Sequence, residues 1–162
     1  MAERPLLCTV DFRRNEKWGS LDAPKSLIPA KQYRAILEAM PVVCVDLIVR
    51  HGSRFLLVKR KNEPLKDEWW VPGGRIFKGE MALEAAYRKL QEETGVKPSR
   101  GFRFVGYYED FYDNSAFEVP CHTLSLLYET EVDSKEVKLD EHSEDFKWDW
   151  GLPMRLRITL KA

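Results

Sequence analysis

The stretch GRIFKGEMALEAAYRKLQEETGV, residues 74–96, decides how this chain folds. It begins with a glycine and carries an isolated glutamate, Glu80, an arginine, Arg88, and two adjacent glutamates, Glu92 and Glu93. Its glycines permit tight turns, and the apolar residues between them recur at helical spacing. Hard cations such as Mg²⁺ bind oxygen ligands and hold substrate phosphates. The stretch therefore predicts a loop, a helix and a second loop that form a site for a metal-bound diphosphate.

Residues 81–94 give the strongest helix prediction in the chain. Their apolar side chains fall within a narrow arc of the helical wheel: Leu83, Tyr87, Leu90 and Thr94. Gly95 is the expected end of the helix. With Leu83 at the centre of the buried face, Glu92 falls on one flank and Glu93 on the opposite flank.

The charged residues of this helix have two readings. On a generic amphipathic helix such residues form ion pairs on a solvated surface. Here the turn Gly73–Gly74 lies just upstream, and neighbouring predicted strands carry arginines that can meet a diphosphate. We therefore interpret the helix as part of a functional metal site.

Lys89 changes the chemistry expected of the helix, because it falls between Glu92 and Glu93 on the helical wheel. A third carboxylate at that position would favour two or more divalent ions. An ammonium instead removes a ligand, adds a like charge beside the metal, and can pair with Glu93 four residues on. The sequence therefore predicts a single metal ion.

Strands are predicted on both sides of the central helix. Residues 42–49 and 55–59 flank a turn and predict a hairpin, and a shorter helix is predicted before them at residues 29–40. Further strands are predicted at residues 69–71, 102–108, 123–131 and 146–150, and the alternating basic tail predicts an edge strand. This order favours an α+β fold with a mixed sheet over a doubly wound parallel sheet.

Composition narrows the classes of protein to consider. A chain of 162 residues favours one domain, residues 1–162. The formal net charge is zero, so neither nucleic acid nor an anionic membrane is an expected partner. The longest apolar runs are too short to span a bilayer, and the N-terminus lacks the features of a signal peptide.

The cysteines and the N-terminal segment add two expectations. Cys8, Cys44 and Cys121 are widely spaced and form no CxxC motif, which favours a reduced, cytoplasmic compartment. Residues 1–30 are punctuated by proline and glycine, which predicts an irregular arm that packs on a partner subunit.

Residues 74–96 resemble the Nudix box, whose pattern is G-x5-E-x7-R-E-U-x-E-E-x-G-U, with U an aliphatic residue. Lys89 stands where the pattern has a glutamate that is implicated in activating water in many members of the family. This departure implies that the base lies elsewhere or that water attacks a different atom. The resemblance implies an α/β/α sandwich, and the matching positions are Gly74, Glu80, Arg88, Leu90, Glu92, Glu93, Gly95 and Val96.

One branch of that family also lacks this glutamate: the GDP-mannose mannosyl hydrolases. The chain resembles this branch over about residues 30–150, including WWVPGGR at 69–75, GYYEDFYD at 106–113 and LDEHSEDFKW at 139–148. The resemblance implies Mg²⁺-dependent hydrolysis of GDP-mannose, or a related GDP-sugar, to GDP and free sugar. Water would attack the anomeric carbon of the sugar.

The resemblance also implies the metal ligands. These are the backbone carbonyl of Gly74 and the carboxylates of Glu93 and Glu141, with Glu92 as a further candidate. Mg²⁺ is the expected ion and Mn²⁺ is an alternative.

Five side chains are assigned to catalysis or substrate binding. The resemblance implies that His142 is the general base, that Arg60 and Arg75 hold the β-phosphate, and that Asp46 helps to position substrate or base. Histidine titrates near neutrality, and arginine makes bidentate contacts to phosphate. Tyr112 belongs to an aromatic cluster that either shapes a sugar or base pocket or packs the sheet, and we assign it to substrate binding.

Two other functions stay open. The retained Glu92 is compatible with a pyrophosphohydrolase that cleaves the diphosphate of a nucleotide sugar or nucleotide. A binding module whose chemistry Lys89 has silenced is the third reading. No motif distinguishes the sugar or the base, and the resemblance and the N-terminal arm favour a homodimer.

Overall fold

A computed structural model describes residues 28–159 of the chain. Within them the strands form one seven-stranded sheet. The predicted N-terminal arm falls mainly on residues 1–27, which lie outside the described residues. The assignment of residues 1–162 to a single domain therefore stays a prediction.

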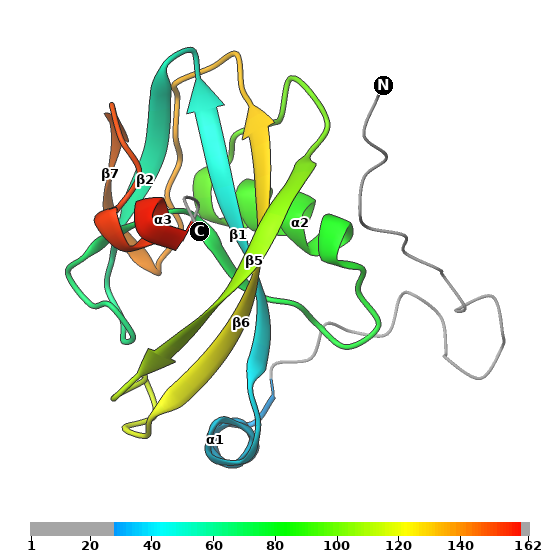
Figure 1. The fold of residues 1–162 in the computed structure, drawn as a ribbon, viewed down its shortest axis with the longest axis vertical. Coiled ribbons are helices and arrows are strands. Elements are labelled where there is room, and N and C mark those ends of the chain that lie inside the picture. Colours follow the sequence, from blue (N-terminus) through cyan, green and yellow to red (C-terminus); the bar gives the residue numbers. More distant parts are fainter. Residues whose placement is uncertain (1–27, 160–162) are drawn as a thin grey trace, which may run out of the picture.

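Four strands lie next to one another in the sheet, in the order β2 (Arg54–Arg60), β1 (Val42–His51), β6 (Cys121–Glu131) and β5 (Arg103–Tyr112) (Figure 1). β1 and β2 form the predicted antiparallel hairpin. β6 lies parallel to β1 on its other side, and β5 pairs antiparallel with β6. The combination of one parallel pair with antiparallel pairs confirms the predicted mixed α+β sheet.

Three further strands complete the sheet around the hairpin. β3 (Trp69–Trp70) and β7 (Ser143–Asp149) pair with β2, and β4 (Gly73–Arg75) pairs with β1. All three pairings are antiparallel. They bring the glycine turn and the C-terminal segment, which are far apart in the sequence, onto the same hairpin.

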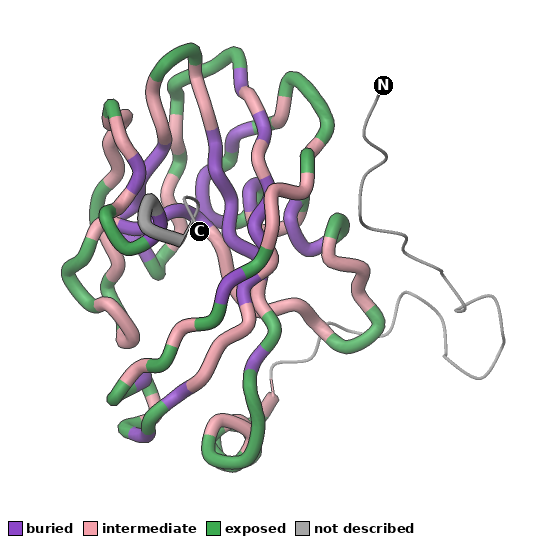
Figure 2. The backbone as a smooth tube through the Cα atoms, viewed as in Figure 1, coloured by how far each residue is buried: buried purple, intermediate pink, exposed green. Residues whose placement is uncertain are grey.

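Helices cover both faces of the sheet, which confirms the α/β/α arrangement (Figure 1). α2 (Ala82–Thr94) packs on one face with Val45 and Leu47 of β1, and α3 (Met154–Thr159) packs on the other with Ile48. Alternate residues of a strand point to opposite faces, so one buried strand supplies both cores. Figure 2 shows that the buried residues concentrate in these central elements.

The buried face of α2 differs from the prediction. Leu83 and Tyr87, placed at its centre from the sequence, are 40% and 43% exposed. Tyr87 stays at the rim, where its ring meets Phe102 edge to face. The helix instead buries two small alanines, which permit close approach to the sheet, and the face that packs inward is Ala85, Ala86, Leu90, Glu93 and Thr94.

The C-terminal tail also differs from the prediction. Its alternating pattern predicted an edge strand, whereas residues 154–159 form α3. Leu156 of this helix and Leu152, which precedes it, both pack into the core. The burial of Leu156, which is 1% exposed, outweighs the alternation. The predicted first helix is confirmed as α1 (Ala30–Ala39).

Candidate active site

The glycine turn brings β1 and α2 into contact. β4 places Gly73 opposite Asp46, and a Cβ at Gly73 would collide with the Asp46 carboxylate. Gly74 has φ +149°, and a Cβ there would collide with the Lys89 side chain. Only glycine permits both this backbone conformation and these close approaches.

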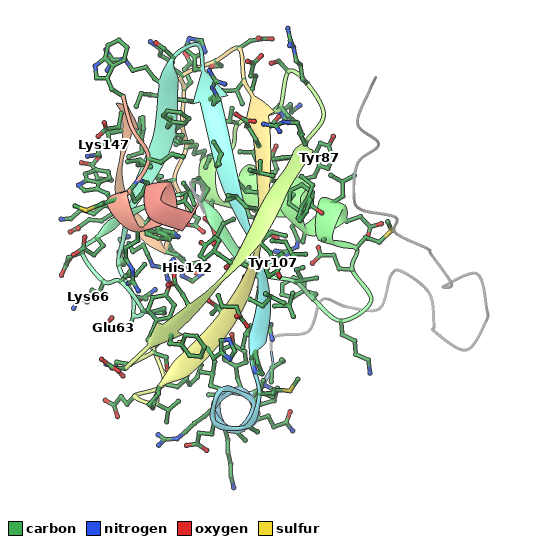
Figure 3. All side chains as sticks on the ribbon, viewed as in Figure 1. Glu63, Lys66, Tyr87, Tyr107, His142 and Lys147 are labelled. Carbon is green, nitrogen blue, oxygen red and sulfur yellow. The ribbon has the colours of Figure 1, made fainter. Side chains whose placement is uncertain are left out.

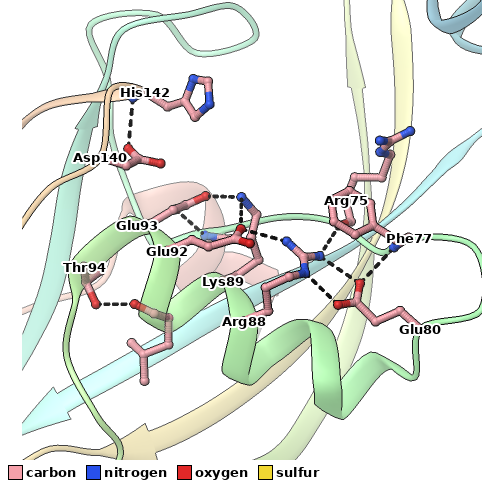
Figure 4. A network of polar contacts seen from close by, with 12 residues as sticks. Arg75, Phe77, Glu80, Arg88, Lys89, Glu92, Glu93, Thr94, Asp140 and His142 are labelled. Atoms are coloured by element: carbon pink, nitrogen blue, oxygen red, sulfur yellow. Dashed lines mark hydrogen bonds and ion pairs between the residues drawn. The ribbon is translucent and has the colours of Figure 1, made fainter. Parts of the chain in front are cut away.

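Glu93 points inward at this turn and contacts Lys89 (Figure 4). Its Oε1 lies 2.7 Å from Lys89 Nζ, and its Oε2 accepts a hydrogen bond from the Gly73 N–H at 3.0 Å. Burial raises the pKa of Glu93, and the adjacent Lys89 partly offsets this effect. The predicted pairing of Lys89 with Glu93 is therefore confirmed.

Glu80 and Arg88 form a second ion pair, which holds the loop before α2. The Nε and Nη2 atoms of Arg88 donate to the two Glu80 oxygens at 2.6 and 2.8 Å, and both side chains are less than a tenth exposed. Glu80 also accepts a hydrogen bond from the Phe77 N–H, and Arg88 donates to the Arg75 carbonyl. The pair thus fixes the backbone of Arg75.

A pocket of about 220 Å³ opens beside the turn and collects five residues assigned from the sequence. It lies on the side of β1 that carries Asp46, and no α2 residue lines it. Trp70 also lines it, together with Tyr33 from α1 and Phe117 from the loop after β5. The assigned residues in its lining are Asp46, Arg60, Gly74, Arg75 and Tyr112.

The two arginines of the pocket are held in different ways. Arg60 Nε donates to the Pro64 carbonyl at 2.8 Å. The Arg75 guanidinium lies 4.8 Å from the centre of the Tyr33 ring and 5.3 Å from that of Phe77. The backbone contact orients Arg60 and the aromatic contacts orient Arg75. Both guanidinium groups keep further N–H donors available for an anion.

Asp46 is a buried acid at the pocket. It accepts a hydrogen bond from the Tyr108 hydroxyl and a further one from Ser125. Burial raises its pKa from 3.8 to about 6, and these hydrogen bonds oppose the rise. The sequence did not indicate Tyr108 as its partner, because Tyr108 stood out only as one of several aromatic residues.

The Asp46→Asn variant is expected to remove a pH-dependent loss of stability. The raised pKa means that folded wild type binds this proton more tightly than the unfolded chain, so ionisation destabilises the fold as the pH rises from about 4 to about 6. A shift of this size corresponds to about 3 kcal/mol at most. Urea unfolding of both proteins at pH 4.5 and 7.5 measures the difference. Equal pH dependence in the two proteins would contradict the assignment.

His142 and Glu141 lie on the segment that leads into β7. Both are exposed, and Lys61 donates to the two backbone carbonyls, from its N–H to His142 and from Nζ to Glu141. In Figure 3, His142 and Glu63 lie towards the same side of the molecule, beside the loop after β2. Neither His142 nor Glu141 lines the pocket as the structure stands.

Asp140 is a neighbour of Glu93 that the sequence analysis did not single out. Its charge contributes to the raised pKa of Glu93, and its Oδ1 accepts a hydrogen bond from the His142 N–H at 2.9 Å. Figure 4 shows Asp140 and His142 on the side of α2 that carries Glu93. The run of acidic residues around His142 was the sequence feature that could have indicated Asp140.

The donor chemistry of this region suits one divalent cation. The oxygens of Glu93, Asp140 and the Gly74 carbonyl are the hard ligands that Mg²⁺ and Mn²⁺ prefer. In residues 28–159, no three Asp, Glu, His or Cys side chains are yet gathered in a metal-binding arrangement. Lys89 contacts Oε1 of Glu93 and the Gly73 N–H donates to Oε2, so both oxygens of that carboxylate have a partner.

Comparison with known proteins identifies the family. A NUDIX domain model matches residues 40–160, so the chain belongs to the Nudix family and is a Nudix hydrolase. Among the curated relatives, the low-salt glycan biosynthesis protein Agl8 of Haloferax volcanii is 40% identical over 126 residues, which cover 76% of this chain and 80% of that protein. The ADP-ribose pyrophosphatase of Methanocaldococcus jannaschii is 32% identical over 115 residues, 71% of this chain and 64% of that enzyme.

Solved structures agree with this assignment. The MutT NUDIX hydrolase of Burkholderia pseudomallei superposes with a TM-score of 0.62 at 25% identity, covering 75% of this chain and 97% of that chain. No helix among residues 28–159 is long and apolar enough to cross a membrane.

Proposed function

We propose that this Nudix hydrolase converts GDP-mannose, or a related GDP-sugar, to GDP and free sugar. The observation that carries the proposal is the pocket, in which Arg60 and Arg75 face the same space as the buried Asp46. Guanidinium groups suit a diphosphate, and a buried carboxylate suits sugar hydroxyls. The name of the Haloferax relative, a glycan biosynthesis protein, supports a nucleotide sugar as substrate.

Lys89 supports attack at carbon rather than at phosphorus. Its ammonium is bound to Glu93 and carries no lone pair with which to activate water. A base outside the helix is needed, and we assign that role to His142, which lies on the side of Glu93 (Figure 4). Its imidazole would accept a proton from water as the water oxygen bonds to the anomeric carbon. The bond from that carbon to the phosphate oxygen breaks, and GDP leaves with its electrons.

The arginines and the metal would stabilise the leaving group. Arg60 and Arg75 would hold the β-phosphate, while Asp46 and Tyr112 would orient the sugar. Mg²⁺ or Mn²⁺, held by Glu93, the Gly74 carbonyl and Glu141, would supply Lewis-acid neutralisation of the diphosphate when bound. The closure of the segment carrying Glu141 and His142 over the turn is part of the proposal, as are a homodimer and a cytoplasmic location.

Hydrolysis in ¹⁸O-labelled water is the test. We expect the label in the released mannose and GDP as the nucleotide product. Label in a phosphate, with GMP and sugar phosphate as products, would contradict the proposal.

That contrary result would establish the second candidate, a pyrophosphohydrolase of ordinary Nudix chemistry. The similarity to an ADP-ribose pyrophosphatase favours this alternative, as does the retained Glu92. Binding of GDP-mannose without formation of any product would instead support the third function, a binding module.

A further inference from the structure

Lys89 lies where a cation would sit on this site. Its Nζ is 2.7 Å from Glu93 Oε1 and 3.9 Å from Glu92 Oε2, and it would be 3.1 Å from a Cβ placed on Gly74. The ammonium is therefore packed against the glycine turn and lies near two carboxylates at once (Figure 4). The Lys89 side chain is only 15% exposed.

Glu93 requires a positive partner because it is buried. Its side chain is 10% exposed, and one backbone N–H from Gly73 is its other hydrogen-bond donor in the described residues. A buried carboxylate without a cation is strongly unfavourable. Lys89, whose Nζ lies 2.7 Å from Glu93 Oε1, supplies this compensating charge.

A divalent ion bound to Glu93 would exclude the Lys89 ammonium from its present position. Both contact the same small oxygen cluster, and two positive charges within a few ångströms repel strongly in a buried setting. The lysine stem has enough rotatable bonds to move aside. Glu92, which is 47% exposed, lies near enough to receive the displaced ammonium.

We propose that Lys89 is a resident cation that occupies Glu93 when no metal is bound and is displaced when a divalent ion binds. Lys89 thereby keeps the site charge-balanced without metal and sets how tightly the metal binds. The proposal rests on the assignment of Glu93 as a metal ligand in the proposed function. It goes further in assigning Lys89 a role that the Nudix pattern does not contain.

The test measures Mn²⁺ binding to purified protein without substrate, by the electron paramagnetic resonance signal of free Mn²⁺. Lys89→Met removes the charge and keeps the length of the side chain. It is expected to bind Mn²⁺ at least about tenfold more tightly than wild type, because the competing charge is gone. Lys97→Met, at an exposed lysine just beyond α2, is the matched control and should bind Mn²⁺ as wild type does.

Thermal unfolding provides a second reading of the same exchange. In EDTA, Lys89→Met is expected to melt about 5–10 °C below wild type, because Glu93 loses its partner. Saturating Mn²⁺ should restore most of that loss and raise the Tm of wild type by less. Lys89→Gln, which retains a hydrogen-bond donor without the charge, gives the same comparison if the methionine variant does not fold.

Equal Mn²⁺ affinity in wild type and both Lys89 variants would overturn the proposal, as would the absence of any Mn²⁺ binding. The measurements contain no nucleotide sugar. A protein that binds Mn²⁺ as expected but releases no GDP from GDP-mannose upholds the role of Lys89 and contradicts the proposed function.

Discussion

Replacement of Arg88 by methionine is expected to lower the free energy of unfolding by about 3–5 kcal/mol, the usual cost of removing one partner of a buried ion pair. Glu80 would keep the hydrogen bond from Phe77 but lose both charged donors of Arg88. Its side chain is 7% exposed, so water cannot replace them fully. Urea unfolding at pH 7 measures the loss.

Glu92→Gln is the matched control for this prediction. Glu92 also pairs with Arg88, at 2.9 Å, but it is 47% exposed, and exposed pairs contribute about 1 kcal/mol or less. The double variant Arg88→Met, Glu80→Gln should recover part of the stability, because no buried charge is then left alone. A loss below about 1 kcal/mol in Arg88→Met would show that the pair does not hold the loop.

His142→Ala is expected to reduce kcat for GDP-mannose about 10²–10⁴-fold, the usual contribution of a general base. The side chain is exposed, and the hydrogen bonds of His142 to Lys61 and Asp140 run through its backbone, so the fold should be retained. Initial rates of GDP release in Mg²⁺, across pH 6–9, provide the measurement.

His51→Ala serves as the control, because His51 lies in the turn end of β1 and contacts the Val132 carbonyl. Its activity should stay within about twofold of wild type, as no role in proton transfer is assigned to it. An unchanged rate in His142→Ala would remove the assigned base and favour cleavage of a phosphorus–oxygen bond.

The sequence predicted the positions of most elements but not how α2 is rotated. Periodicity locates α2 well, since Gly95 ends it in a left-handed conformation. Periodicity alone could not identify the inward face, because two small alanines pack closer to the sheet than Leu83 and Tyr87 do. That rotation turns Glu93 inward.

Site residues that belong to local sequence motifs could be predicted, whereas contacts between distant strands could not. The motif and its resemblance selected Asp46, Arg60, Arg75 and Tyr112, and the fold gathers them in one pocket. The partners of Asp46 depend on strand register, in which Tyr108 lies opposite Ser125. Register between distant strands is set by tertiary packing, so the sequence did not reveal this contact.

The pocket and the charged helix lie on different sides of the sheet, and this separation affects which parts of the site can be altered independently. The pocket is lined by residues of the strands, of α1 and of the connecting loops, whereas α2 carries the ion pairs. The two parts meet at Gly73 and Gly74 and at Arg75, whose carbonyl accepts a hydrogen bond from Arg88. Evolution or an engineer can therefore change the residues that line the pocket to suit a new substrate while the charged helix stays as it is. This separation depends on Gly73 and Gly74. A bulkier residue would collide with Asp46 of the pocket at position 73 and with Lys89 of the helix at position 74.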